Sequence, residues 1–145
     1  MRVVAYSIKS FEKEPLAIAN HKKHEITLIS NSLSEDTAAY AEGKEAVIVF
    51  NDDLVNESVI DKLADLGVKY IATRSTSISN IDQQAAAKRH IKIASVPTSA
   101  LAEHGQASLS MILATVTIQN LDKWSTKSCL GNSCICANSC DRSHH

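Results

Sequence analysis

Residues 46–50 read Ala-Val-Ile-Val-Phe, a wholly apolar run of residues that favour β-strands. Four comparable runs lie along the chain at 3–7, 26–30, 69–73 and 91–96. Continuous rather than alternating apolarity is typical of strands buried on both faces, as in a parallel sheet covered by helices. The run at 46–50 and its four companions therefore predict an α/β fold with about five parallel strands.

Segments with helical periodicity alternate with these runs. We expect helices at 11–23, 34–42, 56–66 and 81–89, with Ser34 as the N-cap of the second and Gly67 just beyond the third. The alternation of strand and helix implies right-handed crossovers and a doubly wound sheet. Residues 1–98 are therefore predicted to form one domain.

The pattern changes twice after Pro97. Residues 99–122 form a long, apolar helical segment, which we expect either to belong to the core or to pack against a second domain. Residues 123–145 carry all four cysteines among Ser, Asn and Gly, with few aliphatic side chains. Such a composition does not bury enough apolar surface to fold, so we expect this tail to be disordered.

Composition excludes several classes of function. Fifteen basic and sixteen acidic residues give a net charge of −1, which offers no basic surface for nucleic acid or an acidic membrane. No apolar run is long enough to cross a bilayer, and the N-terminus turns polar too soon for a signal peptide. We therefore expect a cytoplasmic protein.

The four cysteines follow the pattern C-x4-C-x-C-x3-C and precede Asp141, His144 and His145. Zinc ribbons favour C-x2-C, because two intervening residues bring both thiolates to one metal ion. That spacing is missing here, so we expect no dedicated metal site. A metal-binding appendage remains the weaker alternative for the tail.

The sequence contains no glycine-rich phosphate-binding motif, and no acidic residue follows the first expected strand. The four glycines all lie more than twenty residues apart, which excludes both the G-x-G-x-x-G fingerprint and the phosphate P-loop. Tyr6-Ser7-Ile8-Lys9, after the first strand, carries no acid for a magnesium ion. We expect Asp52 and Asp53 to cap a helix or lie in a solvated turn, with a ligand site at the strand end as the alternative.

One stretch resembles a known family. Residues 72–82 read A-T-R-S-T-S-I-S-N-I-D, residues 85–97 read A-A-A-K-R-H-I-K-I-A-S-V-P, and residues 102–104 read A-E-H. The order and content resemble the N-terminal domain of the D-isomer-specific 2-hydroxyacid dehydrogenases, and within that family the D-lactate dehydrogenase branch. The resemblance covers about residues 1–120.

The resemblance implies a two-domain enzyme that reduces a 2-keto acid such as pyruvate with NADH. It implies a flavodoxin-like substrate domain, followed by a hinge-type helix at 99–122 that leads toward a cofactor domain. In the family, main-chain amides after the fourth strand hold the substrate carboxylate. Carried over to this sequence, those amides belong to Ser75, Thr76 and Ser77.

The sequence departs from the family pattern at several positions, and these departures determine which function we expect. Ser77 stands where the family has Gly, Ser79 stands where it has Asp, and no Tyr lies between Pro97 and Glu103. The family's cofactor fingerprint and its catalytic Arg, Glu and His have no counterpart here. We therefore expect a truncated substrate domain, without NAD-binding or catalytic residues, that is inactive alone. The alternative is a non-enzymatic module that binds a small 2-keto or 2-hydroxy acid, docks on a full-length dehydrogenase or self-associates through an exposed helix at 99–122.

Overall fold

The computed structural model describes residues 1–103, 108–126 and 134–135. Five parallel strands form the sheet in the order β2-β1-β3-β4-β5. Their bounds are β1 Arg2–Ala5, β2 Glu25–Leu28, β3 Ala46–Val49, β4 Tyr70–Thr73 and β5 Lys92–Ala94. A short strand, β6 (Cys134–Ile135), pairs antiparallel with β5. The predicted doubly wound parallel sheet of five strands is thereby confirmed.

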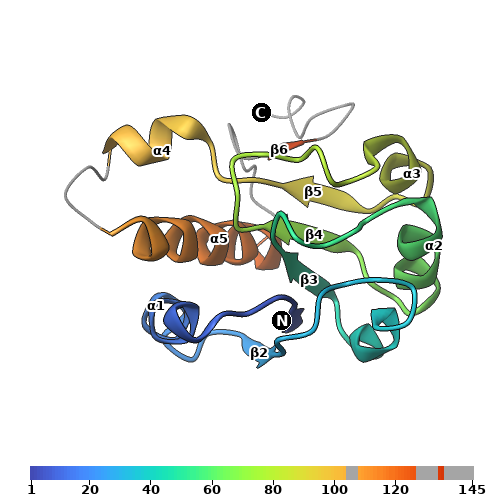
Figure 1. The fold of residues 1–145 in the computed structure, drawn as a ribbon, viewed down its shortest axis with the longest axis horizontal. Helices are drawn as coiled ribbons and strands as arrows, with labels where there is room; N and C mark the ends of the chain where they lie inside the picture. Colours follow the sequence, from blue (N-terminus) through green and yellow to red (C-terminus); the bar gives the residue numbers. More distant parts are fainter. Residues whose placement is uncertain (104–107, 127–133, 136–145) are drawn as a thin grey trace.

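Helices cover both faces of this sheet (Figure 1). On one face lie α1 (Ser10–Asn20) and α5 (Leu109–Ser125), whose side chains join a core with Val3, Ala5 and Ile48. On the other lie the 3₁₀ helix η1 (Ala38–Ala41), α2 (Glu57–Asp65) and α3 (Gln83–Lys88), which pack on alternate strand residues such as Val4 and Val47. All four residues of β3 are fully buried, which explains why its sequence is apolar without alternation.

Side-chain caps fix the starts of two helices close to the predicted positions. Asn56 Oδ1 accepts a hydrogen bond of 3.0 Å from the Val59 amide at the start of α2, and Asp82 Oδ1 accepts one of 3.0 Å from the Ala85 amide at the start of α3. The first helix ends three residues before the predicted end at 23, because His21 and Lys22 adopt left-handed backbone angles (φ 48° and 61°).

The helix predicted at 34–42 is wrong in extent and in its cap. Only the 3₁₀ turn Ala38–Ala41 forms, and Thr37 rather than Ser34 precedes it. The Thr37 hydroxyl accepts a hydrogen bond from the Ser34 amide (2.8 Å) and donates one to the Ser32 carbonyl (2.6 Å). These local bonds compete with an α-helix for the same backbone groups.

The single helix predicted at 99–122 is also wrong. The structure has α4 (Thr98–Glu103) and a separate α5, which extends three residues past 122. Ser108 caps α5, since its hydroxyl accepts a hydrogen bond of 3.2 Å from the Met111 amide. A new N-cap marks a new helix rather than the continuation of α4.

Most of α5 is buried in the core, which is one of the two alternatives expected for residues 99–122, and it is not the exposed helix that self-association was expected to use. Its buried residues are Ile112, Ala114, Val116, Thr117, Ile118, Asn120, Leu121 and Trp124. Trp124 stacks on Tyr70 of β4 with ring centroids 4.7 Å apart. Because this face of α5 packs on the sheet of the same chain, it does not supply the exposed apolar surface that was expected to drive self-association.

The cysteine-rich tail predicted at 123–145 falls mostly outside the described residues. Residues 123–125 are the end of α5, so the prediction of disorder is wrong there, and Cys134–Ile135 form β6 against Ile93 and Ala94. For the rest of the tail, the predictions of disorder and of a metal-binding appendage lie outside the described residues. Within the described part of the chain, no helix is long and apolar enough to cross a membrane.

Candidate functional site

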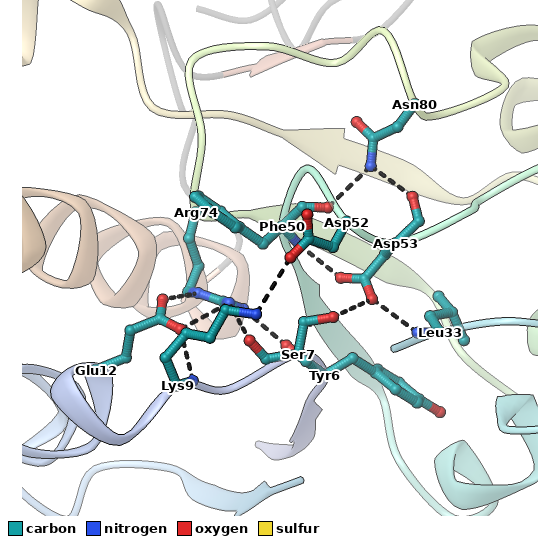
Figure 2. Close-up of polar contacts among 10 residues, drawn as sticks. All are labelled: Tyr6, Ser7, Lys9, Glu12, Leu33, Phe50, Asp52, Asp53, Arg74 and Asn80. Atoms are coloured by element: carbon teal, nitrogen blue, oxygen red, sulfur yellow. Dashed lines mark hydrogen bonds and ion pairs between the residues drawn. The ribbon is translucent and has the colours of Figure 1, made fainter. Parts of the chain in front are cut away.

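The candidate site lies where the strand order reverses. From β1 the chain moves outward to β2 and then returns to β3 on the other side of β1, so the crossovers diverge between β1 and β3. Ligands of doubly wound sheets bind at this switch point, outside the carboxyl ends of the strands. The loops after β1, β3 and β4 meet there, as Figure 2 shows.

The loop after β4 contains the three predicted residues. Ser75 is buried, Thr76 is exposed and Ser77 is half-buried. The Ser75 hydroxyl accepts a hydrogen bond of 3.0 Å from the Ser77 amide, and the Ser75 carbonyl accepts one of 3.0 Å from the Val96 amide of the neighbouring segment. Among the described residues, none accepts a hydrogen bond from the main-chain amides of Ser75 and Thr76.

Ser77 does not need a glycine-like backbone. The described residues with positive φ that are not glycine are Ser7, His21, Lys22 and His90, and Ser77 is not among them. Serine in place of the family glycine is therefore not strained at this position. Instead, the Ser77 amide is committed to the Ser75 hydroxyl, which leaves two of the three predicted amides for a ligand.

Arg74 lies at the start of this loop with a side chain only 1% exposed. Its guanidinium donates to both carboxylate oxygens of Glu12 (2.7 and 3.2 Å) and to the carbonyls of Tyr6 and Ser7 (3.1 and 3.2 Å). The guanidinium carbon also lies 5.1 Å from the centre of the Phe50 ring. Arg74 therefore ties the β4 end to the β1 end, and Glu12 compensates its charge.

Asp53 corrects the sequence interpretation, because it neither caps a helix nor lies in a solvated turn. Its side chain is buried at 1% exposure, and its carboxylate accepts hydrogen bonds from the Ser7 hydroxyl (2.6 Å) and from the amides of Leu33 and Phe50 (2.7 Å each). Asp52 behaves as predicted: it is exposed and pairs with Lys9 at 3.2 Å.

Tyr6 directly follows β1 and lies near Asp53 at the carboxyl edge of the sheet. Its hydroxyl donates a hydrogen bond of 2.8 Å to the Thr37 carbonyl. Burial raises the pKa of the Tyr6 hydroxyl above its usual range, and the negative charge of Asp53 and the neighbouring Tyr40 add to this shift. Tyr6 is therefore a neutral hydrogen-bond donor over the whole physiological pH range.

A cavity of about 210 Å³ opens between α1 and α5 next to Arg74. Its walls include Phe11, Leu16, Phe50, Leu109 and Leu113, with Lys9 and Glu12 near them. Phe11 and Leu109 are largely exposed at its rim. This arrangement can hold an apolar group beside Arg74.

The first turn of α1 does not fit the pyrophosphate of a nicotinamide cofactor. In a dinucleotide-binding fold this turn follows β1 and presents free amides to phosphate. Here the Glu12 carboxylate occupies that position, accepting a hydrogen bond of 2.9 Å from the Lys9 amide while it pairs with Arg74. A carboxylate at this place repels phosphate, so these residues do not fit the pyrophosphate of a nicotinamide cofactor.

Sequence reasoning missed Arg74, Asp53 and Ser7 as parts of the site. Arg74 stood inside the quoted motif, and the rarity of an arginine directly after a buried strand was an available signal. Asp52 and Asp53 are adjacent and chemically identical in sequence terms, so only the packing separates them. No sequence signal distinguished the left-handed backbone of Ser7 (φ 58°).

Comparison with known proteins identifies the family. The model of the D-isomer specific 2-hydroxyacid dehydrogenase catalytic domain matches residues 3–139. The chain belongs to this family. The match includes most of the cysteine-rich segment, which the sequence analysis placed outside the resemblance.

Individual proteins of similar sequence or structure are consistent with this family match. D-lactate dehydrogenase of Escherichia coli is 36% identical over 108 residues, which span 72% of this chain and 33% of the enzyme. Its apo structure superposes with a TM-score of 0.66, at 36% identity over 72% of this chain and 34% of that one. An aromatic 2-oxoacid reductase of Clostridium sporogenes is 32% identical over 98 residues, or 67% of this chain and 30% of the reductase.

A second solved structure matches more of the chain. Salmonella D-lactate dehydrogenase superposes with a TM-score of 0.65 at 29% identity and covers 96% of this chain and 42% of that one. The 145 residues thus span about a third of the length of the curated relatives they match.

Proposed function

We propose that this chain is the substrate-binding part of a D-2-hydroxyacid dehydrogenase and holds the carboxylate of a 2-keto acid on the amides of Ser75 and Thr76. The observation that carries the proposal is the pair of successive amides without an acceptor among the described residues, at the switch point of the sheet. Successive main-chain amides form a concave anion site, which suits a carboxylate.

The cavity between α1 and α5 supports a place for the rest of the substrate. It adjoins Arg74, which directly precedes the proposed carboxylate site, and its walls are apolar. A methyl group leaves most of about 210 Å³ empty, whereas an aromatic ring fills more of it. The matched relatives include both a D-lactate dehydrogenase and an aromatic 2-oxoacid reductase. We propose that this cavity admits 2-keto acids with side chains larger than that of pyruvate.

We propose that hydride transfer requires residues in addition to the 145 of this chain. The sequence lacks a glycine cluster, and Glu12 occupies the helix terminus where a pyrophosphate would lie. We propose that the 145 residues bind a 2-keto acid but do not by themselves oxidise NADH.

Calorimetric titration with pyruvate and with pyruvamide tests the binding proposal. Pyruvamide has the same shape without the negative charge, so we expect heat of binding from pyruvate and none from pyruvamide. Thr76→Pro, which removes one of the two amides, should abolish binding, whereas Thr76→Ala, which keeps that amide, should not. Equal binding of both ligands, or no binding of pyruvate to a chain shown to be folded by circular dichroism, would contradict the proposal.

An NADH oxidation assay with pyruvate tests the second part. We expect no turnover above the rate without protein. Turnover by the purified chain would show that a cofactor site exists outside the features described above.

A further inference from the structure

We propose that Asp53 and Asn80 form a clamp that positions the Ser75 and Thr76 amides for the substrate carboxylate. The inference rests on the proposed function, and it concerns residues that do not touch the ligand themselves. It follows from the hydrogen bonds that join three loops at the carboxyl edge of the sheet, which Figure 2 shows together.

Asp53 joins three segments that are far apart in sequence. One carboxylate oxygen accepts from the Ser7 hydroxyl after β1 (2.6 Å) and from the Leu33 amide after β2 (2.7 Å). The other oxygen accepts from the Phe50 amide at the end of β3 (2.7 Å). Short bonds to a buried carboxylate are strong, so these segments hold a fixed arrangement.

Asn80 connects this arrangement to the loop after β4. Its side-chain amide donates to the carbonyls of Phe50 (2.9 Å) and Asp53 (2.8 Å). The main-chain carbonyl of Asn80 accepts a hydrogen bond of 3.1 Å from the Val55 amide, and the main-chain amide of Asp82 donates one of 2.9 Å to the Val55 carbonyl. The loop after β4 is thus fixed at its far end to the segment that Asp53 organises.

The near end of the same loop is fixed separately. The Arg74 amide donates to the Val49 carbonyl (2.9 Å), and the Ser75 carbonyl accepts from Val96 (3.0 Å). Ser75 is thus part of the near anchor, and Thr76 lies between it and Asn80. The direction of their amides therefore depends on both ends of the loop, although neither residue is hydrogen-bonded to the Asp53 carboxylate.

A carboxylate is needed at position 53. Its three donors require a group that only accepts, and both oxygens of Asp53 are used. Asparagine has nearly the same shape but one accepting oxygen, so its amino group would face either the Phe50 amide or the Ser7 and Leu33 donors. Asp53→Asn therefore breaks the clamp while it changes the volume of the core very little.

The test compares Asp53→Asn with Asp52→Asn in the full 145-residue chain. Asp52 is exposed and, among the described residues, its side chain pairs only with Lys9, so its substitution removes the same charge next to the clamp. Amide chemical shifts of Ser75, Thr76 and Ser77 are measured without ligand, and the dissociation constant for pyruvate is then measured by calorimetry. A second control, Ile60→Val, weakens the core on the opposite face of the sheet from α1 and reports the effect of lower stability alone.

We expect Asp53→Asn to shift the Ser75–Ser77 amide resonances and to weaken pyruvate binding about tenfold or more, since small displacements of binding groups have large effects. Asp52→Asn and Ile60→Val should do neither. Asn80→Ala removes the second half of the clamp and should reproduce both effects, which keeps the test decisive if Asp53→Asn does not fold.

Two results would overturn the clamp. One is a folded Asp53→Asn or Asn80→Ala chain with wild-type amide shifts in residues 75–77. The other is wild-type pyruvate affinity in these variants. If the wild-type chain itself does not bind pyruvate, the proposed function fails, and the amide shifts of the ligand-free chains still decide whether the clamp positions the loop.

Discussion

At the scale of single residues, the site is built from buried charges with complete sets of partners. Arg74 and Asp53 are both 1% exposed, and each is held by hydrogen bonds to segments distant in sequence. A buried charge with partners costs little, whereas the same charge without partners destabilises the fold strongly. These two side chains therefore fix the loops around the candidate carboxylate site.

Arg74→Lys tests this view of the buried charges. Lysine keeps the positive charge but cannot donate to both oxygens of Glu12 and to two carbonyls in one plane. We expect a loss of about 2–4 kcal/mol in the free energy of unfolding, measured by urea titration. Arg89→Lys is the matched control, because Arg89 pairs with Asp61 and Asp65 at the surface, and its unfolding midpoint should stay nearly unchanged. Equal effects of the two substitutions would contradict the role of Arg74.

At the scale of helices and strands, α1 and α5 form one layer over the sheet and enclose the cavity between them. Their packing is reinforced at one end by Asp122 of α5. This carboxylate pairs with Lys23 (2.7 Å) and with Nε2 of the buried His24 (2.7 Å), both just after α1. The helix pair thus connects the N-terminal segment to the C-terminal helix of the described chain.

The Asp122 ion pairs predict a pH dependence of stability. Burial raises the pKa of the Asp122 carboxyl, but the hydrogen bonds and charges of Lys23 and His24 lower it more, so the net pKa is lowered. A carboxyl with a lowered folded-state pKa stabilises the fold fully above its ordinary value of 3.8, and the contribution is lost as the pH falls through the folded value.

We therefore expect Asp122→Asn to lower stability at pH 7 and to flatten the loss of stability below about pH 4. Thermal unfolding from pH 7 to pH 2 measures this dependence. Asp36→Asn, at an exposed position, should keep the wild-type pH profile. A wild-type profile in Asp122→Asn would show that the ion pairs contribute nothing to folding.

The cavity predicts a selective effect on larger ligands. Leu113→Trp places an indole in the space between α1 and α5. We expect it to weaken the binding of phenylpyruvate and to leave pyruvate binding nearly unchanged, as measured by calorimetry on both ligands. Gln119→Trp, on the exposed side of α5, is the control and should affect neither ligand. Parallel losses for both ligands in Leu113→Trp would place the side-chain site elsewhere.

Elements that depend on short local sequence patterns could be predicted, whereas features that depend on particular side-chain hydrogen bonds could not. Apolar strands such as 46–50 and the helices at 56–66 and 81–89 are local patterns, so they were predicted close to their true positions. The break between α4 and α5 depends on a cap at Ser108, and the weak helix at 34–42 depends on the hydrogen bonds of Thr37. The difference between Asp52 and Asp53 depends on hydrogen bonds that join the three segments after β1, β2 and β3. Such contacts leave no periodic trace in the sequence.

At the scale of the whole molecule, the described residues form a sheet covered on both faces. The buried face of α5 packs on Ala5, Ile48, Ala72 and Ala94, which belong to four different strands. The family match through residue 139 agrees with a domain in which this C-terminal part is integral. The domain is therefore expected to fold without help from another chain.

Removing residues 108–145 tests whether the domain needs α5. We expect a chain that ends at Ala107 to lose its cooperative thermal transition and to bind the dye ANS, because the apolar surface under α5 becomes exposed. Removing only residues 136–145 should preserve the transition, because this leaves α5 and β6 in place. Cooperative unfolding of the shorter chain would contradict the integral role of α5.

Titration of the ¹⁵N-labelled chain with pyruvate, followed at each main-chain amide resonance, shows whether the Ser75 and Thr76 amides hold the carboxylate of a 2-keto acid. We expect saturable shifts that are largest at Ser75 and Thr76, smaller at Ser77, and absent when pyruvamide replaces pyruvate. Saturable shifts confined to another part of the chain, or no saturable shifts in a folded chain, would contradict this proposal.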